Sequence, residues 1–162
     1  MGTYTFARVP VAYVKFTVAG TYHTSGVPVA GQFADTISLS AGTLLDGALR
    51  DQGWWTDTFL VGSTAEGTAT GEGAAYGQPG SASGIHLDTT HATAAYVFPV
   101  SLVVDPQVGH DVTILFTLNT YEDFHWEDET QTGYKAGVFD VSYGAFEPVT
   151  QLGANSFSVT ME

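Results

Sequence analysis

Apolar side chains alternate with polar ones along most of this chain. Between Tyr96 and Val104 nearly every second residue is aromatic or aliphatic, and the same period recurs from Ile114 to Leu118. A period of two places these side chains on one face of an extended strand, as in strands with one buried face. Shorter runs of the same kind predict strands at Val9–Val18, Gln32–Leu39, Phe59–Val61, Ala136–Tyr143 and Ser156–Met161. About seven or eight strands separated by turn signals predict an all-β fold, an antiparallel two-sheet β-sandwich of immunoglobulin-like or jelly-roll type.

The alternation that begins at Ile114 keeps its parity as far as Phe124 and Trp126. If the strand continues without a bulge, the intervening residues Asp123 and His125 face away from the core. We therefore expect both polar side chains on an exposed strand face.

One segment departs from the period of two and predicts a short helix at Leu44–Gln52. Thr43 followed by Asp46 resembles a capping box with Asp in place of Glu. Gly53 suits the end of a helix. The apolar stripe of this helix comprises Leu44, Leu45, Ala48 and Leu49. We expect the helix to pack across one end of the sandwich.

The segment from Gly62 to Gly84 has seven glycines and no Val, Leu or Ile. It predicts a long surface loop, which a weak strand around Thr68–Tyr76 would shorten. Neither an internal repeat nor a clear linker divides the chain, so we expect a single domain over residues 1–162.

The charge balance is strongly acidic, with 17 Asp and Glu against four Lys and Arg and a net charge of -13. No basic patch is present that would follow a phosphate backbone, so nucleic acid is excluded as a partner. No apolar run reaches the roughly 20 residues of a membrane span. The chain has no cysteine, which excludes disulfides and thiolate metal sites.

The abundance of Thr, Ser, Gly and aromatic residues with few lysines is typical of exported β domains. We therefore expect an extracytoplasmic location (periplasmic, cell-surface or secreted), with the export signal absent from this sequence.

His86 and His91 flank four residues, Leu87 to Thr90. A four-residue hairpin loop would place the two histidines opposite each other, with Cβ atoms about 5 Å apart, where both imidazoles reach one metal ion. Zn or Cu needs a further ligand. The candidates for it are Asp88, His110, His125 and Asp128. The alternative is a pair of exposed turn histidines without a function.

Five carboxylates, one imidazole and three aromatic rings crowd into the nine residues from Tyr121 to Glu129. This acidic stretch offers oxygen ligands for Ca²⁺, although its spacing is not that of an EF-hand. Asp123 and His125, two apart on a strand, would instead present a carboxylate and an imidazole to a transition metal. A solvated strand end that discourages edge pairing is the alternative.

The sequence lacks the motifs of the common enzyme classes. Gly80-Ser81-Ala82-Ser83-Gly84 has Ala where a nucleophile elbow needs Ser, and the zinc-protease, Walker and dinucleotide motifs are missing. Carboxylate pairs such as those of glycosidases meet only in the fold, so the sequence does not select one. An enzyme is therefore the less favoured class.

Three tryptophans are candidate stacking surfaces for a ligand, namely Trp54, Trp55 and Trp126. Taken together, the sequence favours a non-catalytic binding domain for a divalent or copper-like metal ion (Cu, Zn or Ca). The candidate metal ligands are His86, His91, His125, Asp123 and Asp128. A module that binds carbohydrate or protein through exposed aromatics is the alternative, followed by a structural or surface-assembly domain.

Overall fold

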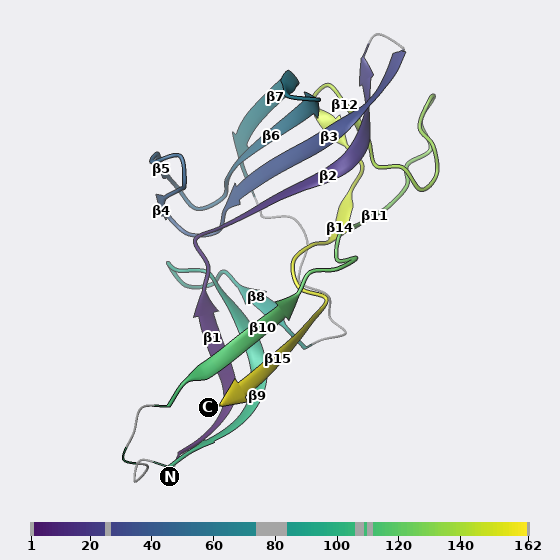
Figure 1. Cartoon of the computed structure of the whole chain (residues 1–162). Helices are drawn as coiled ribbons and strands as arrows, with labels where there is room; N and C mark the ends of the chain where they lie inside the picture. The colour runs from purple at the N-terminus through teal and green to yellow at the C-terminus, as the bar shows by residue number, and fades with distance from the viewer. Residues whose placement is uncertain (1, 25–26, 74–83, 106–108, 110–111, 162) are drawn as a thin grey trace.

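The computed structural model describes residues 2–24, 27–73, 84–105, 109 and 112–161, and in these ranges the chain forms strands and no helix. The predicted all-β fold is therefore confirmed. The largest sheet has six strands in the order β13-β12-β2-β3-β6-β7 and lies in the upper part of Figure 1. Its strands are β2 (Tyr13–Thr24), β3 (Val27–Ser38), β6 (Trp54–Val61), β7 (Thr64–Glu72), β12 (Asp140–Ser142) and β13 (Ala145–Phe146). Pairing is antiparallel except between β12 and β2, which run parallel.

The lower part of Figure 1 contains a three-stranded sheet and a two-stranded sheet. The first consists of β1 (Gly2–Pro10), β9 (Ala95–Val104) and β8 (His86–Asp88), and the second of β10 (Ile114–Asn119) and β15 (Ser156–Met161). Two short pairs complete the fold, β11 (His125–Trp126) with β14 (Val149–Gln151), and β4 (Gly42–Thr43) with β5 (Leu49–Arg50).

Three clusters of buried side chains form the core. One lies on the six-stranded sheet around Phe33, Phe59 and Phe139. Another lies between the lower sheets, where Phe98 packs against Phe116 and Phe157 with ring centroids 5.8 Å and 5.2 Å apart. The third cluster joins the two parts, because Ile37 and Leu39 from the end of β3 pack with Leu87 and Ala94 from the lower sheet.

The helix expected at Leu44–Gln52 is wrong, since these residues form a turn and the short strand β5, which pairs with β4 just before them. Gly47 adopts a φ of +79°, and Asp46 Oδ1 accepts a hydrogen bond from the backbone N–H of Ala48. Two side chains of the expected apolar stripe, Leu45 and Leu49, are 82% and 76% exposed. Of the stripe's leucines only Leu44 is buried, so a short helix with a central glycine would lack the packing that stabilises it, and Asp-Gly favours a turn.

The strand that begins at Ile114 ends at Asn119, earlier than its alternation suggests. Glu122 adopts a φ of +52° in the turn that follows. The parity is therefore lost, and Asp123, expected on an exposed face, is only 4% exposed. His125 is exposed, as expected.

The glycine-rich segment begins as a strand, because β6 and β7 form a hairpin that turns at Gly62 and Ser63. The predicted weak strand around Thr68–Tyr76 thus overlaps β7, and its last residues lie outside the described ranges. No helix long and apolar enough to cross a membrane occurs in the described part of the chain.

Candidate functional site

Two aspartates lie side by side on the inward face of the six-stranded sheet. Asp35 follows Phe33 on β3 at the spacing of one strand face, and Asp57 lies between Trp55 and Phe59 on β6 in the same way. The register of β3 with β6 pairs Asp35 directly with Asp57. Residues paired in this way have Cβ atoms about 5 Å apart, so the two carboxyl groups share one environment.

Both carboxyl groups are removed from water. Asp35 is 1% exposed and Asp57 is 8% exposed. Among the described residues, no side chain or backbone group is placed to hydrogen-bond either oxygen of Asp35 or Oδ1 of Asp57. A buried polar group without a partner is costly, and native structures tolerate few of them. Apart from the two aspartates themselves, the described part of the fold therefore supplies little hydrogen bonding to this pair.

The environment opposes ionisation of the pair. Burial, followed by the charge of Asp57, raises the pKa of Asp35 to about 9. Burial also raises the pKa of Asp57, to about 6. Near neutral pH the two groups therefore hold one proton and one negative charge between them, as expected of adjacent buried carboxyl groups.

A cavity of about 520 Å³ lies against Asp57, between β7 and the β12–β13 hairpin. Its volume arises from the pairing of β6 with β7, where each large inward residue faces a small one. The pairs are Trp55 with Gly71, Asp57 with Ala69, and Phe59 with Gly67. The aromatic lining of the cavity consists of Tyr22, Phe33, Trp55, Phe59, Tyr143 and Phe146. Among the described residues that line it, Asp57 is the one carboxylic acid, and none is a Lys or Arg.

Trp55 owes its position to the missing side chain of Gly71. A Cβ atom added to Gly71 would lie 2.4 Å from Cζ2 of the indole, closer than any real contact. The indole therefore lies directly over the backbone of β7. Tyr22 packs against Phe59 with ring centroids 5.1 Å apart. These contacts hold the aromatic walls on either side of Asp57.

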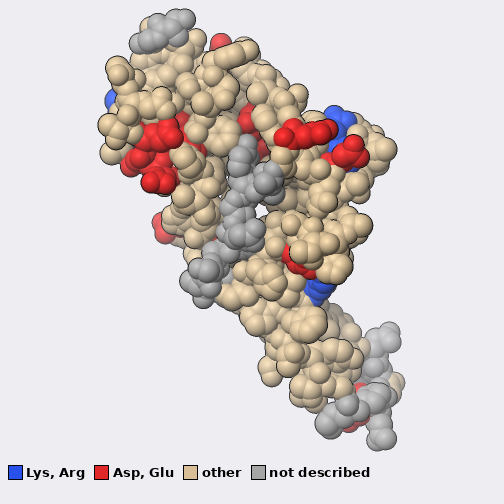
Figure 2. Space-filling view, turned by 180° about the vertical axis from the view of Figure 1, so that it is seen from behind, with Lys and Arg blue, Asp and Glu red and all other residues tan. Residues whose placement is uncertain are grey.

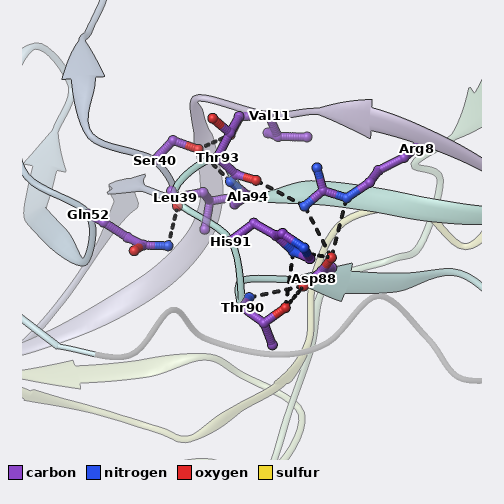
Figure 3. Close-up of polar contacts among 10 residues, drawn as sticks. All are labelled: Arg8, Val11, Leu39, Ser40, Gln52, Asp88, Thr90, His91, Thr93 and Ala94. Atoms are coloured by element: carbon purple, nitrogen blue, oxygen red, sulfur yellow. Dashed lines mark hydrogen bonds and ion pairs between the residues drawn. The ribbon is translucent and has the colours of Figure 1, made fainter.

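The histidines at the predicted hairpin site do not face each other. In the β8–β9 register His86 pairs with Val97, and Asp88 pairs with Ala95, so the loop has six residues, 89–94. His91 lies in this loop, and its Nδ1 is 3.0 Å from Asp88 Oδ2 (Figure 3).

Asp88 organises this loop. Its carboxylate accepts hydrogen bonds from Arg8 and from the backbone N–H and hydroxyl of Thr90, as Figure 3 shows. These bonds, those of Thr90 foremost, lower the pKa of Asp88 far below its ordinary value. These hydrogen bonds stabilise the turn. They explain the position of Asp88 as structural, without a bound ligand.

The acidic stretch uses two of its carboxylates to hold the chain. Both oxygens of Asp128 accept from the backbone N–H of Gly137 at 3.0 Å, and Oδ1 also accepts from Trp126 Nε1 at 3.1 Å. Asp123 Oδ1 accepts from Gln151 Nε2 at 2.7 Å. On the face seen in Figure 2, carboxylates gather mainly over the upper part of the molecule, and few basic side chains lie among them.

Within the described ranges, no group of three His, Asp or Glu side chains is arranged to hold a metal ion. His110, a candidate third ligand, lies outside those ranges. Of the three candidate tryptophans, only Trp55 lines the cavity. The Arg50 guanidinium covers the ring of Trp54 at 4.4 Å, and Trp126 packs on Phe139 at 5.8 Å.

A second group of buried polar residues, which the sequence analysis missed, joins β2 to the β12–β13 hairpin. His23 Nε2 is 2.6 Å from Asp140 Oδ1, and Asp140 Oδ2 accepts from the backbone N–H of Lys135. The fully buried Glu147 accepts from the backbone N–H groups of Glu129 and Asp140, each at 2.8 Å. The oxygens of Asp140 and Glu147 are thus occupied by the protein itself, which indicates a structural role.

The Asp35–Asp57 pair was also missed, although its signal is present in the alternation. Phe33-Ala34-Asp35-Thr36-Ile37 and Trp55-Thr56-Asp57-Thr58-Phe59 each place an aspartate at the centre of an apolar strand face. A carboxylate in that position is either buried or breaks the strand.

Comparisons with known proteins identify no family for this chain. No family model matches the sequence, and no curated protein or solved structure matches it. The fold and the cavity therefore carry the functional argument alone.

Proposed function

We propose that this chain is a binding domain for a small organic molecule, and that its binding site is the aromatic cavity beside Asp57. The observation that carries the proposal is the position of Asp57, a carboxyl group that is 8% exposed, in the wall of a cavity lined mainly by aromatic side chains. Ligand sites are typically concave and mainly apolar, with a few polar groups that orient the ligand.

The composition of the cavity supports a ligand with flat or aliphatic faces. Aromatic side chains come from four parts of the sheet, and Asp57 is the one carboxylic acid among the described residues of the lining. The sequence-based alternative, a module that binds carbohydrate or protein through exposed aromatics, shares one residue with this cavity, Trp55.

Thermal unfolding in the presence of a panel of neutral, cationic and anionic organic compounds tests the proposal. A compound that binds only the folded protein raises its Tm by mass action. In an Ala69→Phe variant the new ring fills the cavity opposite Asp57, so the shift is expected to disappear. Ala65→Phe, on the exposed part of the same strand, is the matched control, and we expect it to retain the ligand-induced rise in Tm. A panel without any shift, or shifts that survive Ala69→Phe, would contradict the proposal.

The other sequence-based hypotheses remain predictions. No described geometry favours a metal ion at His86, His91 or His125, and location outside the cytoplasm depends on composition alone. We also propose that β1-β9-β8 and β10-β15 are the two layers of the expected sandwich. The contacts of Phe98 with Phe116 and Phe157 between these sheets support that arrangement.

A further inference from the structure

The negative charge beside the cavity has no basic side chain to balance it. Arg8 pairs with Asp88, and Arg50 pairs with Asp46. Lys15 and Lys135 are exposed, and neither lines the cavity. No Lys or Arg therefore balances a negative charge on Asp57.

One proton neutralises only one of the two carboxyl groups. Because Asp35 is the more deeply buried, it keeps its proton to higher pH, and Asp57 carries the remaining charge near neutrality. Asp57 is also the member of the pair that reaches the cavity wall. A carboxylate surrounded by aromatic rings is strongly attractive to a positive charge, since little water screens it.

The surroundings favour an organic cation over a metal ion. A metal ion takes several protein ligands, whereas the described residues that line the cavity include one carboxylate, Asp57, and no histidine. An alkylammonium group needs one counter-charge, and its carbon substituents gain from contact with aromatic faces through cation–π interactions. Tyr22, Trp55 and Phe59 supply such rings around Asp57.

We propose that the ligand of this cavity is an organic monocation, a quaternary or tertiary alkylammonium compound, whose charge is balanced by Asp57 and whose substituents lie on the aromatic walls. This inference rests on the proposed function, because it names the ligand class for the same cavity. It differs from that function in requiring positive charge on the ligand.

Isothermal titration with choline and with its neutral carbon isostere, 3,3-dimethylbutan-1-ol, separates the two claims. The compounds match in shape and differ in charge. Choline is expected to bind wild-type protein at least about tenfold more tightly than the isostere. In Asp57→Asn, which keeps the side-chain shape and removes the charge, that preference is expected to vanish. Asp51→Asn, at an exposed turn residue, controls for general attraction to an acidic protein and is expected to retain it.

Asp35→Asn provides a second variant, because it leaves the charge of Asp57 in place, and we expect the preference for choline to persist in it. Equal binding of the two compounds to wild-type protein would overturn the ammonium assignment and leave the binding cavity standing. Failure of choline to bind would also overturn it, whatever the compound panel shows for the cavity itself. A loss of preference in Asp51→Asn as large as in Asp57→Asn would assign the effect to the acidic surface and overturn it as well.

Discussion

Asp35 and Asp57 pair across β3 and β6 on the apolar face of the largest sheet, at 1% and 8% exposure, without a basic side chain beside them. Two carboxyl groups in such a place destabilise the fold, because burial penalises their charged forms. Uncharged side chains of similar volume at these two positions would remove this destabilisation. A costly polar pair at the wall of a cavity is a common mark of a functional site.

Asp35→Asn is expected to stabilise the protein at neutral and alkaline pH. Asp35 keeps its proton in the folded state up to about pH 9, whereas in the unfolded chain it ionises near its ordinary pKa of about 4. A raised folded-state pKa gives a stabilising contribution that is complete below the unfolded pKa and is lost as pH rises towards the folded one.

The difference in unfolding free energy between Asp35→Asn and wild type should therefore grow from pH 5 to pH 9. With a linkage slope of about 1.4 kcal/mol per pH unit, we expect it to grow by about 5 kcal/mol in favour of the variant over this range. Urea unfolding at several pH values measures it, with Asp51→Asn as the control. If the unfolding free energies of wild type and Asp35→Asn changed with pH in parallel, the pKa of Asp35 would be the same in the folded and unfolded states, which would contradict the account.

Gly71→Ala is expected to displace Trp55 and to destabilise the protein by about 1–3 kcal/mol. The added Cβ would lie 2.4 Å from the indole, so the ring has to move away from β7 and lose its contact with that strand. Gly73→Ala is the matched control, because its Cβ would lie 3.9 Å from the same indole. Denaturant unfolding of both variants is the measurement, and equal stabilities would contradict the position of Trp55.

Glu147→Ala is expected to cost about 2–4 kcal/mol, because it leaves the backbone N–H groups of Glu129 and Asp140 buried without acceptors. Glu127→Ala removes an exposed carboxylate from the same region and should change stability little. The two values come from urea unfolding at one pH. A small effect of Glu147→Ala would mean that water reaches these amides.

Asp128→Ala distinguishes a structural carboxylate from a metal ligand. The substitution removes the acceptor for Gly137 N–H and Trp126 Nε1, so a loss of about 1–2 kcal/mol is expected. The loss should be the same with and without EDTA, and EDTA should leave the Tm of wild-type protein unchanged. A wild-type Tm that falls with EDTA, and no longer does so in Asp128→Ala, would instead support the metal-ion hypothesis for the acidic stretch.

The alternation of side chains predicts strands well where a long strand has one buried face. The strand around Phe98 and Leu102 and the strand at Ser156–Met161 occur as expected. It fails where a glycine with positive φ interrupts a plausible helix, as at Gly47, and where a turn breaks the parity, as at Glu122. These outcomes depend on which apolar face finds a partner, and a local pattern does not contain that information.

The sequence alone predicts only part of the candidate site. Trp55 was singled out as a possible ligand contact, and the aspartate within each apolar strand face was visible as a pattern. The direct pairing of Asp35 with Asp57 depends on the register of β3 and β6, and the cavity depends on the small residues of β7 opposite β6. Neither relationship is encoded in the spacing of residues along one strand.

The central claim is that the cavity beside Asp57 binds an organic ligand. Amide chemical-shift mapping by two-dimensional NMR, during titration with a compound that raises the Tm, tests it most directly. The account predicts that the shifts concentrate at Gly67, Ala69 and Thr70 on β7 and at Tyr143 and Ala145 of the β12–β13 hairpin, which line the cavity from opposite sides. Shifts that concentrate on the lower sheets or on the loop of His91, with these amides unmoved, would contradict it.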